Sequence, residues 1–65
     1  MKYYITRNNN IARVGPNYWS LHYENDEPDR YAESPFRIKS VIQLGWVEIS
    51  YNELPGWAQY QFDKE

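Results

Sequence analysis

Ser20 and His22 come closest to a catalytic pair in this chain. They stand two positions apart, so in a strand they share one face, where a hydroxyl and an imidazole could act as nucleophile and general base. His22 is the only histidine, no Gly-x-Ser-x-Gly motif surrounds the serine, and the sequence reveals no third, orienting group. We therefore expect His22 to be a surface residue on the polar face of a strand, with Tyr18, Ser20 and Glu24.

Carboxylates gather just after this predicted strand. One histidine, His22, with nearby loop carboxylates is too few ligands for a convincing metal site. Asp26, Glu27 and Asp29 lack the ligand spacing of a calcium loop, and Pro28 interrupts them. The three glycines stand apart, so no phosphate-binding loop is present. We expect a solvated acidic loop, no metal, no cofactor and no enzymatic activity.

Aromatic side chains dominate the hydrophobic residues: seven Tyr, three Trp and two Phe in 65 residues. A domain this small cannot bury so many hydroxyls and indole N–H groups with partners. We expect Trp19 and Trp46 in the core and some of the other rings half-exposed, where interfaces favour aromatic anchors. The candidate partner-binding residues are Tyr4, Tyr18, His22, Tyr51 and Trp57, with Asp26, Glu27 and Asp29 as an electrostatic rim.

Charge is distributed unevenly along the chain. The net charge is −2, and residues 1–23 carry Lys2, Arg7 and Arg13 without an acid, whereas residues 24–33 are acidic. An acidic domain is a poor match for nucleic acid, because neutralisation of phosphates supplies most of that affinity. No apolar run approaches the roughly 20 residues of a membrane span. We expect neither a nucleic-acid partner nor a membrane.

Three strands are predicted in the N-terminal half. Residues 2–6 and 11–14 are rich in β-forming residues and flank an Asn-rich turn, as in a hairpin. Residues 18–24 alternate, with Trp19, Leu21 and Tyr23 on the apolar face. Residues 25–30 read as a polar connection in which Pro28 prevents further ladder pairing.

In the C-terminal half, the spacing of the apolar residues changes from strand-like alternation to a helical period. Ser34-Pro35 and Gly45 bracket a predicted helix of residues 35–44, and residues 46–51 return to strand character. Residues 51–62 remain open: Ser50 and Glu53 have capping-box spacing, while residues 57–62 alternate as a terminal strand would. The predicted fold class is α+β, a single domain of residues 1–65. It consists of an antiparallel β-meander of three N-terminal strands plus one or two C-terminal strands, with one short helix (35–44) packed on one face.

These observations favour a non-enzymatic protein–protein interaction module, with the cytoplasm as its expected location. In size and composition the chain resembles the small cysteine-free proteins that phages and mobile elements encode to block larger host proteins, which implies an inhibitor acting in the host cytoplasm. Surplus aromatic surface and the lack of disulfides also predict a two-fold homodimer. Two alternatives remain: a single-stranded nucleic-acid binder using the N-terminal hairpin, and a structural small subunit of an assembly.

Overall fold

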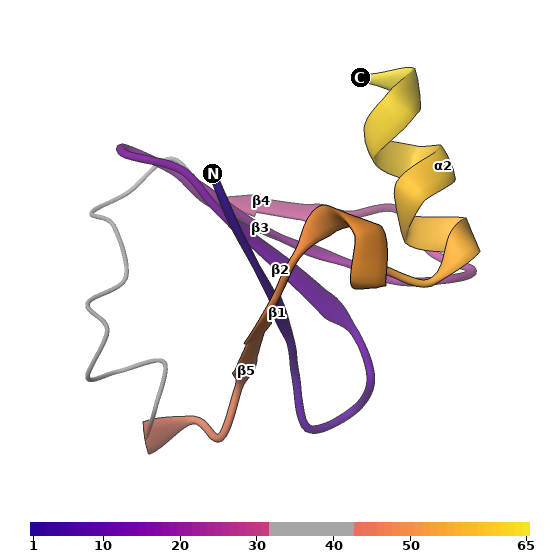
Figure 1. Ribbon diagram of the computed structural model, residues 1–65. Helices are drawn as coiled ribbons and strands as arrows, with labels where there is room; N and C mark the ends of the chain where they lie inside the picture. Colours follow the sequence, from indigo (N-terminus) through magenta and orange to yellow (C-terminus); the bar gives the residue numbers. More distant parts are fainter. Residues whose placement is uncertain (32–42) are drawn as a thin grey trace.

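The computed structural model describes residues 1–31 and 43–65. It contains an antiparallel sheet of β1 (Lys2–Ile5), β2 (Ile11–Val14), β3 (Trp19–His22), β4 (Asp29–Tyr31) and β5 (Val47–Ile49), followed by the 3₁₀ turn η1 (Tyr51–Glu53) and the helix α2 (Gly56–Lys64). The α+β class with a β-meander is confirmed (Figure 1). The helix expected at residues 35–44 lies almost wholly outside the described residues. Among the described residues, no helix is long and apolar enough to cross a membrane.

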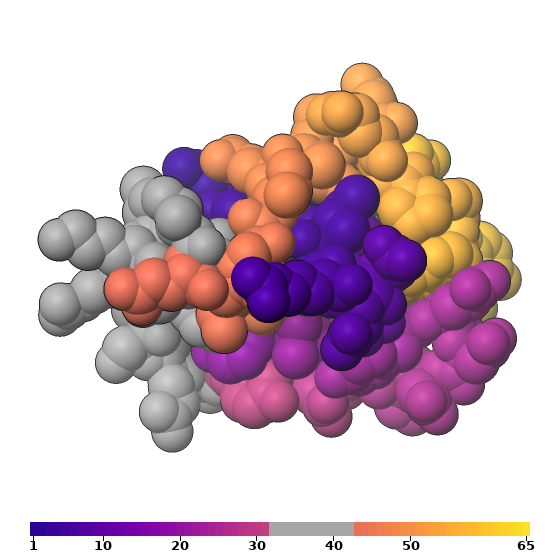
Figure 2. Space-filling model, turned by 90° about the horizontal axis from the view of Figure 1, so that it is seen from below, coloured from indigo at the N-terminus to yellow at the C-terminus, as the bar shows by residue number. Residues whose placement is uncertain are grey.

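The strands run in the order β4-β3-β2-β1-β5. The first four form the meander, and β5 returns to pair with β1, with Tyr3 opposite Ile49. Viewed from the end that carries the β1–β2 turn, the N-terminal hairpin accordingly lies between the β5–η1 segment and the β3–β4 segment (Figure 2). The predicted strands at 2–6, 11–14, 18–24 and 46–51 are therefore present. The second has its predicted bounds, and the other three are shorter than expected.

The Asn-rich turn closes the β1–β2 hairpin. The backbone N–H of Thr6 donates to the carbonyl oxygen of Asn10 at 2.9 Å, and the N–H of Asn10 donates to the Thr6 hydroxyl at 3.1 Å. Asn9 has a φ of 62°, a left-handed conformation that asparagine tolerates better than most residues. Local turn chemistry thus sets the register of this hairpin.

The prediction of a polar connection without strand pairing over residues 25–30 was wrong for its last two residues. Asp29–Tyr31 forms β4 and pairs with β3, with Trp19 opposite Tyr31 and Leu21 opposite Asp29. Pro28 directly precedes the strand, so its missing N–H removes no ladder hydrogen bond. The N-terminal meander therefore has four strands rather than the predicted three.

The alternative of a terminal strand at residues 57–62 was also wrong, because these residues belong to α2. Pro55 stands before the first turn, and its carbonyl oxygen accepts from the N–H of Ala58 at 3.0 Å. Leu54, Ala58 and Phe62 recur every four residues and are all buried, which is helical periodicity. The Ser50–Glu53 capping box is present upstream, with the Ser50 N–H donating to Oε1 of Glu53 at 3.0 Å.

The sheet carries apolar side chains on both faces. On one face, Ile11 packs with Leu54, which lies between η1 and α2, and with Ala58 and Phe62 of α2. On the other, Tyr4 and Ala12 are buried among the half-buried side chains Val14, Leu21 and Trp46. Strand alternation therefore separates two small clusters rather than one buried and one solvated face.

Candidate functional site

An aromatic pocket lies at the outer strands of the sheet. The indole of Trp19 and the phenol of Tyr31 stack with their ring centroids 4.0 Å apart and their planes 12° apart, because the two residues face each other across the β3–β4 ladder. With Tyr18, Ser20 and Arg30 they line a pocket of about 220 Å³. We call this surface, made by Tyr18, Trp19, Arg30 and Tyr31, the β3–β4 edge.

Tyr18 is held in place at one end of this pocket. Its carbonyl oxygen accepts from the N–H of Gly15 at 2.9 Å, and a Cβ at Gly15 would lie only 2.8 Å from Cε1 of the Tyr18 ring. The glycine therefore provides the space into which the ring folds. The Tyr18 hydroxyl also lies 3.5 Å from Sδ of Met1.

The acidic loop begins beyond the other end of β3. Tyr23, Asp26, Glu27 and Asp29 line a hollow of about 410 Å³. The Tyr23 hydroxyl donates to Oδ2 of Asp29 at 2.7 Å, and this hydrogen bond, with the carboxylate charge, raises the pKa of Tyr23 to about 12. Tyr23 therefore joins the end of β3 to the start of β4.

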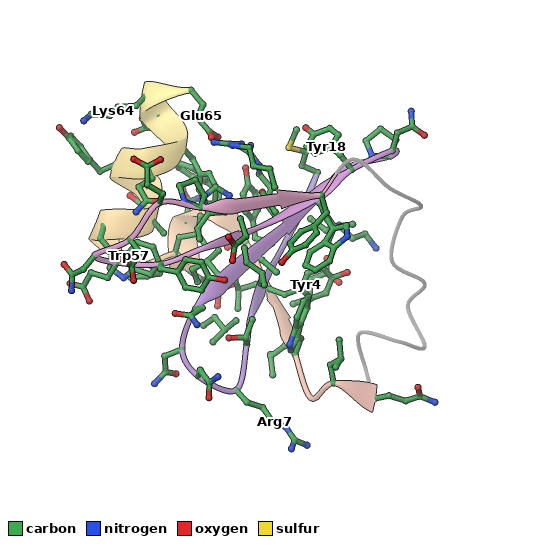
Figure 3. All side chains as sticks on the ribbon, turned by 180° about the vertical axis from the view of Figure 1, so that it is seen from behind. Tyr4, Arg7, Tyr18, Trp57, Lys64 and Glu65 are labelled. Carbon is green, nitrogen blue, oxygen red and sulfur yellow. The ribbon has the colours of Figure 1, made fainter. Side chains whose placement is uncertain are left out.

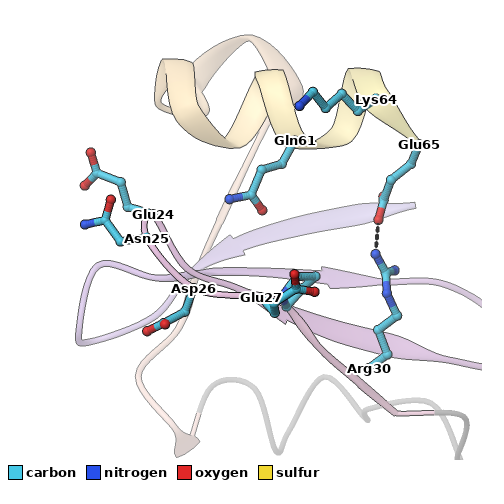
Figure 4. Close-up of a pocket in the computed structure, with 9 residues that line it drawn as sticks. Glu24, Asn25, Asp26, Glu27, Arg30, Gln61, Lys64 and Glu65 are labelled. Atoms are coloured by element: carbon cyan, nitrogen blue, oxygen red, sulfur yellow. Dashed lines mark hydrogen bonds and ion pairs between the residues drawn. The ribbon is translucent and has the colours of Figure 1, made fainter.

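A larger cavity of about 530 Å³ separates the acidic loop from α2. The loop contributes four exposed side chains and Pro28. From the other side, Gln61 and Glu65 point toward the loop, and Lys64 lines the cavity along the helix (Figure 4). The guanidinium of Arg30 pairs with Glu65 across this gap. Within the residues that the structure describes, no three histidine or acidic side chains are placed to hold a metal ion.

The expectation that His22 lies on the surface was wrong. Its side chain and that of Ser20 are each 1% exposed, because they face α2 rather than solvent. Oγ of Ser20 lies 2.7 Å from Nε2 of His22, and Nδ1 of His22 lies 3.3 Å from Oε1 of Gln61. The orienting group that the sequence did not reveal is thus Gln61, which stands 39 residues further along the chain.

The Ser20–His22–Gln61 chain has the order of a catalytic triad but lacks the access that catalysis requires. A nucleophile must reach its substrate, whereas the serine and the histidine are enclosed between the sheet and α2. Ser20 borders the aromatic pocket, yet almost none of its surface is exposed. The arrangement satisfies buried polar atoms and orients the helix.

The predicted partner-binding residues do not form one surface. Tyr4 is 7% exposed and packs against Trp46, so Tyr4 and His22 are both too buried to serve as contact residues. Tyr51 and Trp57 are half-buried beside the Ile11 cluster, and Figure 3 places Trp57 by α2, well apart from Tyr18. The acidic residues Asp26, Glu27 and Asp29 are exposed on the loop.

Tyr31 is the site residue that the sequence analysis missed. It is 37% exposed and completes the aromatic pocket, but it follows a proline and a charged pair that indicate a loop. The available signal was the short segment Asp29-Arg30-Tyr31 itself, which ends in an aromatic residue. Trp19, expected in the core, is half-buried and forms the other half of the stack, and Trp46 is half-buried as well.

Most of the Tyr and Trp side chains are only partly buried. All ten Tyr and Trp residues lie within the described ranges, and only Tyr4 is buried. Tyr31 and Tyr60 are exposed, at 37% and 62%, and the other seven are half-buried. Comparison with protein-family models, with curated proteins and with solved structures finds no match for this chain. Its function therefore has to follow from the geometry and charge of these side chains.

Proposed function

We propose that this protein is a non-enzymatic protein–protein interaction module that binds its partner through the β3–β4 edge. The observation that carries the proposal is the pocket of about 220 Å³ lined by Tyr18, Trp19 and Tyr31. Interface hot spots are enriched in Trp, Tyr and Arg, and the β3–β4 edge consists of these three residue types. A single apolar side chain of the partner would fill a pocket of this size.

The rings at this edge are already ordered. The Trp19–Tyr31 stack and the packing of Tyr18 against Gly15 fix the positions of the three side chains. Binding then loses less side-chain entropy than it would with free rotamers, which leaves more of the contact free energy for affinity. Pre-ordered rings support a role in recognition.

The acidic loop would act as the rim of this surface. Glu24, Asp26 and Glu27 are exposed, and Arg30, the cation nearest to them in sequence, already pairs with Glu65. A rim of one charge sign speeds association and selects partners of the opposite sign. We infer a larger protein with a basic surface, whose activity this module would block by covering it, as a phage-type inhibitor does.

The alternative of a single-stranded nucleic-acid binder is weakened, because two of the hairpin side chains that it required are not accessible. The Arg13 side chain is 12% exposed and pairs with Glu65, and the ring of Tyr4 is buried. Lys2 and Arg7 remain exposed on the hairpin. Phosphate-dominated binding requires more accessible positive charge than these two side chains supply.

Self-association is part of the proposal. Met1, Leu44 and Val47 are large apolar residues exposed at 66%, 45% and 61%, and a second copy of the chain could cover them in a two-fold dimer. Sedimentation equilibrium at about micromolar concentration would detect such a dimer. A monomer whose melting temperature is independent of concentration would contradict it.

Affinity capture with matched variants tests the binding proposal. The wild-type chain, Tyr31→Ser and Tyr60→Ser are immobilised separately and exposed to the same cell extract, and retained proteins are identified by mass spectrometry. Tyr60 lies on α2 and makes the same substitution away from the β3–β4 edge. We expect a specific protein to be retained by the wild type and by Tyr60→Ser and lost with Tyr31→Ser. Equal retention by all three, or none by any, would reject the proposal.

A further inference from the structure

His22 lies at the joint between the sheet and α2. The imidazole is 1% exposed, and its ring meets the ring of Phe62 edge-on, with the centroids 4.5 Å apart. Gln61 and Phe62 are neighbours on α2, so two consecutive helical side chains contact one histidine of β3. The docking of α2 is therefore sensitive to the state of this ring.

The hydrogen bonds define which nitrogen of His22 carries the proton. Nε2 of Gln61 donates to the backbone oxygen of Tyr23 at 2.7 Å, an atom that can only accept. The Oε1 atom of Gln61 therefore faces Nδ1 of His22, which must donate to it, 3.3 Å away. Nε2 of the imidazole is left as the acceptor for the Ser20 hydroxyl at 2.7 Å. The chain is fully satisfied only when His22 is neutral.

A second proton on His22 would break this arrangement. Nε2 would become a donor, so the Ser20 hydroxyl would have to turn and lose its acceptor. The pKa of His22 is lowered from 6.5, chiefly by burial and also by the positive charges of Arg13 and Arg30. The hydrogen bond to Gln61 and the negative charge of Glu65 act in the opposite direction but are outweighed. A buried imidazolium would thus lie near two guanidinium groups and one carboxylate.

The charged groups around His22 come from each element packed against it. Arg13 belongs to β2, Arg30 to β4, and Glu65 follows α2 and pairs with both arginines. The other charged groups near the end of α2 are engaged elsewhere: Asp63 accepts from the Tyr51 hydroxyl, and Lys64 lies over the Tyr60 ring. The Glu65 carboxylate therefore already pairs with two arginines, so it stabilises a protonated His22 less than an unpaired carboxylate would.

We propose that His22 is an acid-sensitive switch that holds α2 against the sheet when it is neutral and releases the helix when it is protonated. The helix is the part that moves, because its nine residues are too few to be stable without tertiary packing. The sheet, in contrast, is held by four antiparallel ladders. Release would expose Ile11 and the apolar side of α2, and would separate Glu65 from Arg30 at the β3–β4 edge.

NMR of the wild-type protein tests the switch directly. Because His22 is the only histidine, its imidazole gives a single set of side-chain nitrogen signals, which report tautomer and protonation. The pH is lowered from about 7.5 to about 4.5, across the histidine range, and protection factors for amide exchange are measured at each step. We expect the Nδ1–H tautomer at high pH. As the ring protonates, protection in α2 should fall at least about tenfold before it falls in β1–β3.

Three variants separate the switch from general acid unfolding. His22→Gln should abolish the pH dependence of α2 protection above about pH 5, whereas Glu65→Gln should retain it. Ser20→Ala removes the donor to Nε2, so the protonation midpoint should rise. The proposal is overturned if α2 stays protected while the ring protonates, if α2 and the sheet lose protection together, or if His22→Gln behaves as the wild type. None of these outcomes depends on a binding partner.

Discussion

Nη2 of Arg13 lies 2.7 Å from Oε2 of Glu65, which links the second strand to the residue that follows α2. The guanidinium also lies over the Phe62 ring, with Cζ 4.8 Å from the ring centroid. Its side chain is 12% exposed, and that of Glu65 is 28% exposed. A cation buried to this extent depends on its carboxylate, since the Nε atom of Arg13 has no hydrogen-bond partner among the described residues.

We expect Glu65→Gln to lower the free energy of unfolding by about 1–2 kcal/mol, because it leaves the Arg13 guanidinium without its counter-charge. Urea denaturation followed by tryptophan fluorescence measures the change. Asp26→Asn is the matched control, since it removes a carboxylate from the exposed loop and should change stability by less than about 0.5 kcal/mol. An equal loss in both variants would show that net charge, rather than the Arg13 contact, is responsible.

The free energy of unfolding should fall in two separate pH ranges as the solution is acidified. The pKa of His22 is lowered in the folded state, so the unfolded chain binds its proton first and stability declines as the pH drops below about 6.5. Burial alone would raise the pKa of Glu65, but Arg30 and Arg13 lower it overall from 4.5. Its contribution is therefore lost only at lower pH.

Thermal melts between about pH 7.5 and pH 3 measure this dependence. His22→Gln should remove the decline near pH 6 and leave the lower one in place. If the wild type is equally stable at pH 7 and pH 5, the neutral, buried state assigned to His22 is wrong.

Gly45→Ala should destabilise the protein by about 1 kcal/mol or more, because Gly45 has a φ of +77°, which L-residues adopt at a cost. The Arg7 side chain also occupies the space that the new Cβ would enter. Gly56→Ala provides the control: nothing lies within 4 Å of a Cβ there, and alanine at the start of α2 should leave stability unchanged or raise it by up to about 1 kcal/mol. The reverse order of melting temperatures would contradict the left-handed conformation.

The Tyr23 phenol should titrate near pH 12, well above an ordinary tyrosine at 10.0, because its hydrogen bond to Asp29 stabilises the protonated form. In Asp29→Asn the carboxylate charge is gone, and the pKa should fall toward the ordinary value. Carbon NMR of the tyrosine rings resolves the individual titrations. An unchanged Tyr23 pKa in the variant would show that Asp29 isn't the cause.

Local sequence signals predicted much of the sheet. The β-forming residues around the Asn-rich turn predicted β1 and β2, and the Asn9 conformation explains why the turn closes there. In contrast, β4 has three residues after a proline, too few for a periodic pattern. The segment from Trp57 to Phe62 fits both alternation and helical spacing, and the packing of Ala58 and Phe62 with Ile11 favours the helix.

The sequence predicted an aromatic binding surface but not which residues form it. Composition alone indicated that several Tyr and Trp rings are at least half-exposed, and only one of the ten is buried. The contacts between particular rings could not be predicted in this way, because the Trp19–Tyr31 stack requires β4, a strand that the sequence analysis did not predict. Of the predicted contact residues, Tyr18 alone belongs to the β3–β4 edge.

The sequence by itself determined the strand period, the hairpin turn and the surplus of rings, because each depends on neighbouring residues or on composition. The tertiary structure alone decided which face of β3 is covered. Ser20 and His22 alternate with Trp19 and Leu21 whatever covers them, but Gln61 of α2 must lie against the polar side for His22 to be buried there. Alternation is a property of the local backbone, whereas the occupant of each face comes from residues far along the chain.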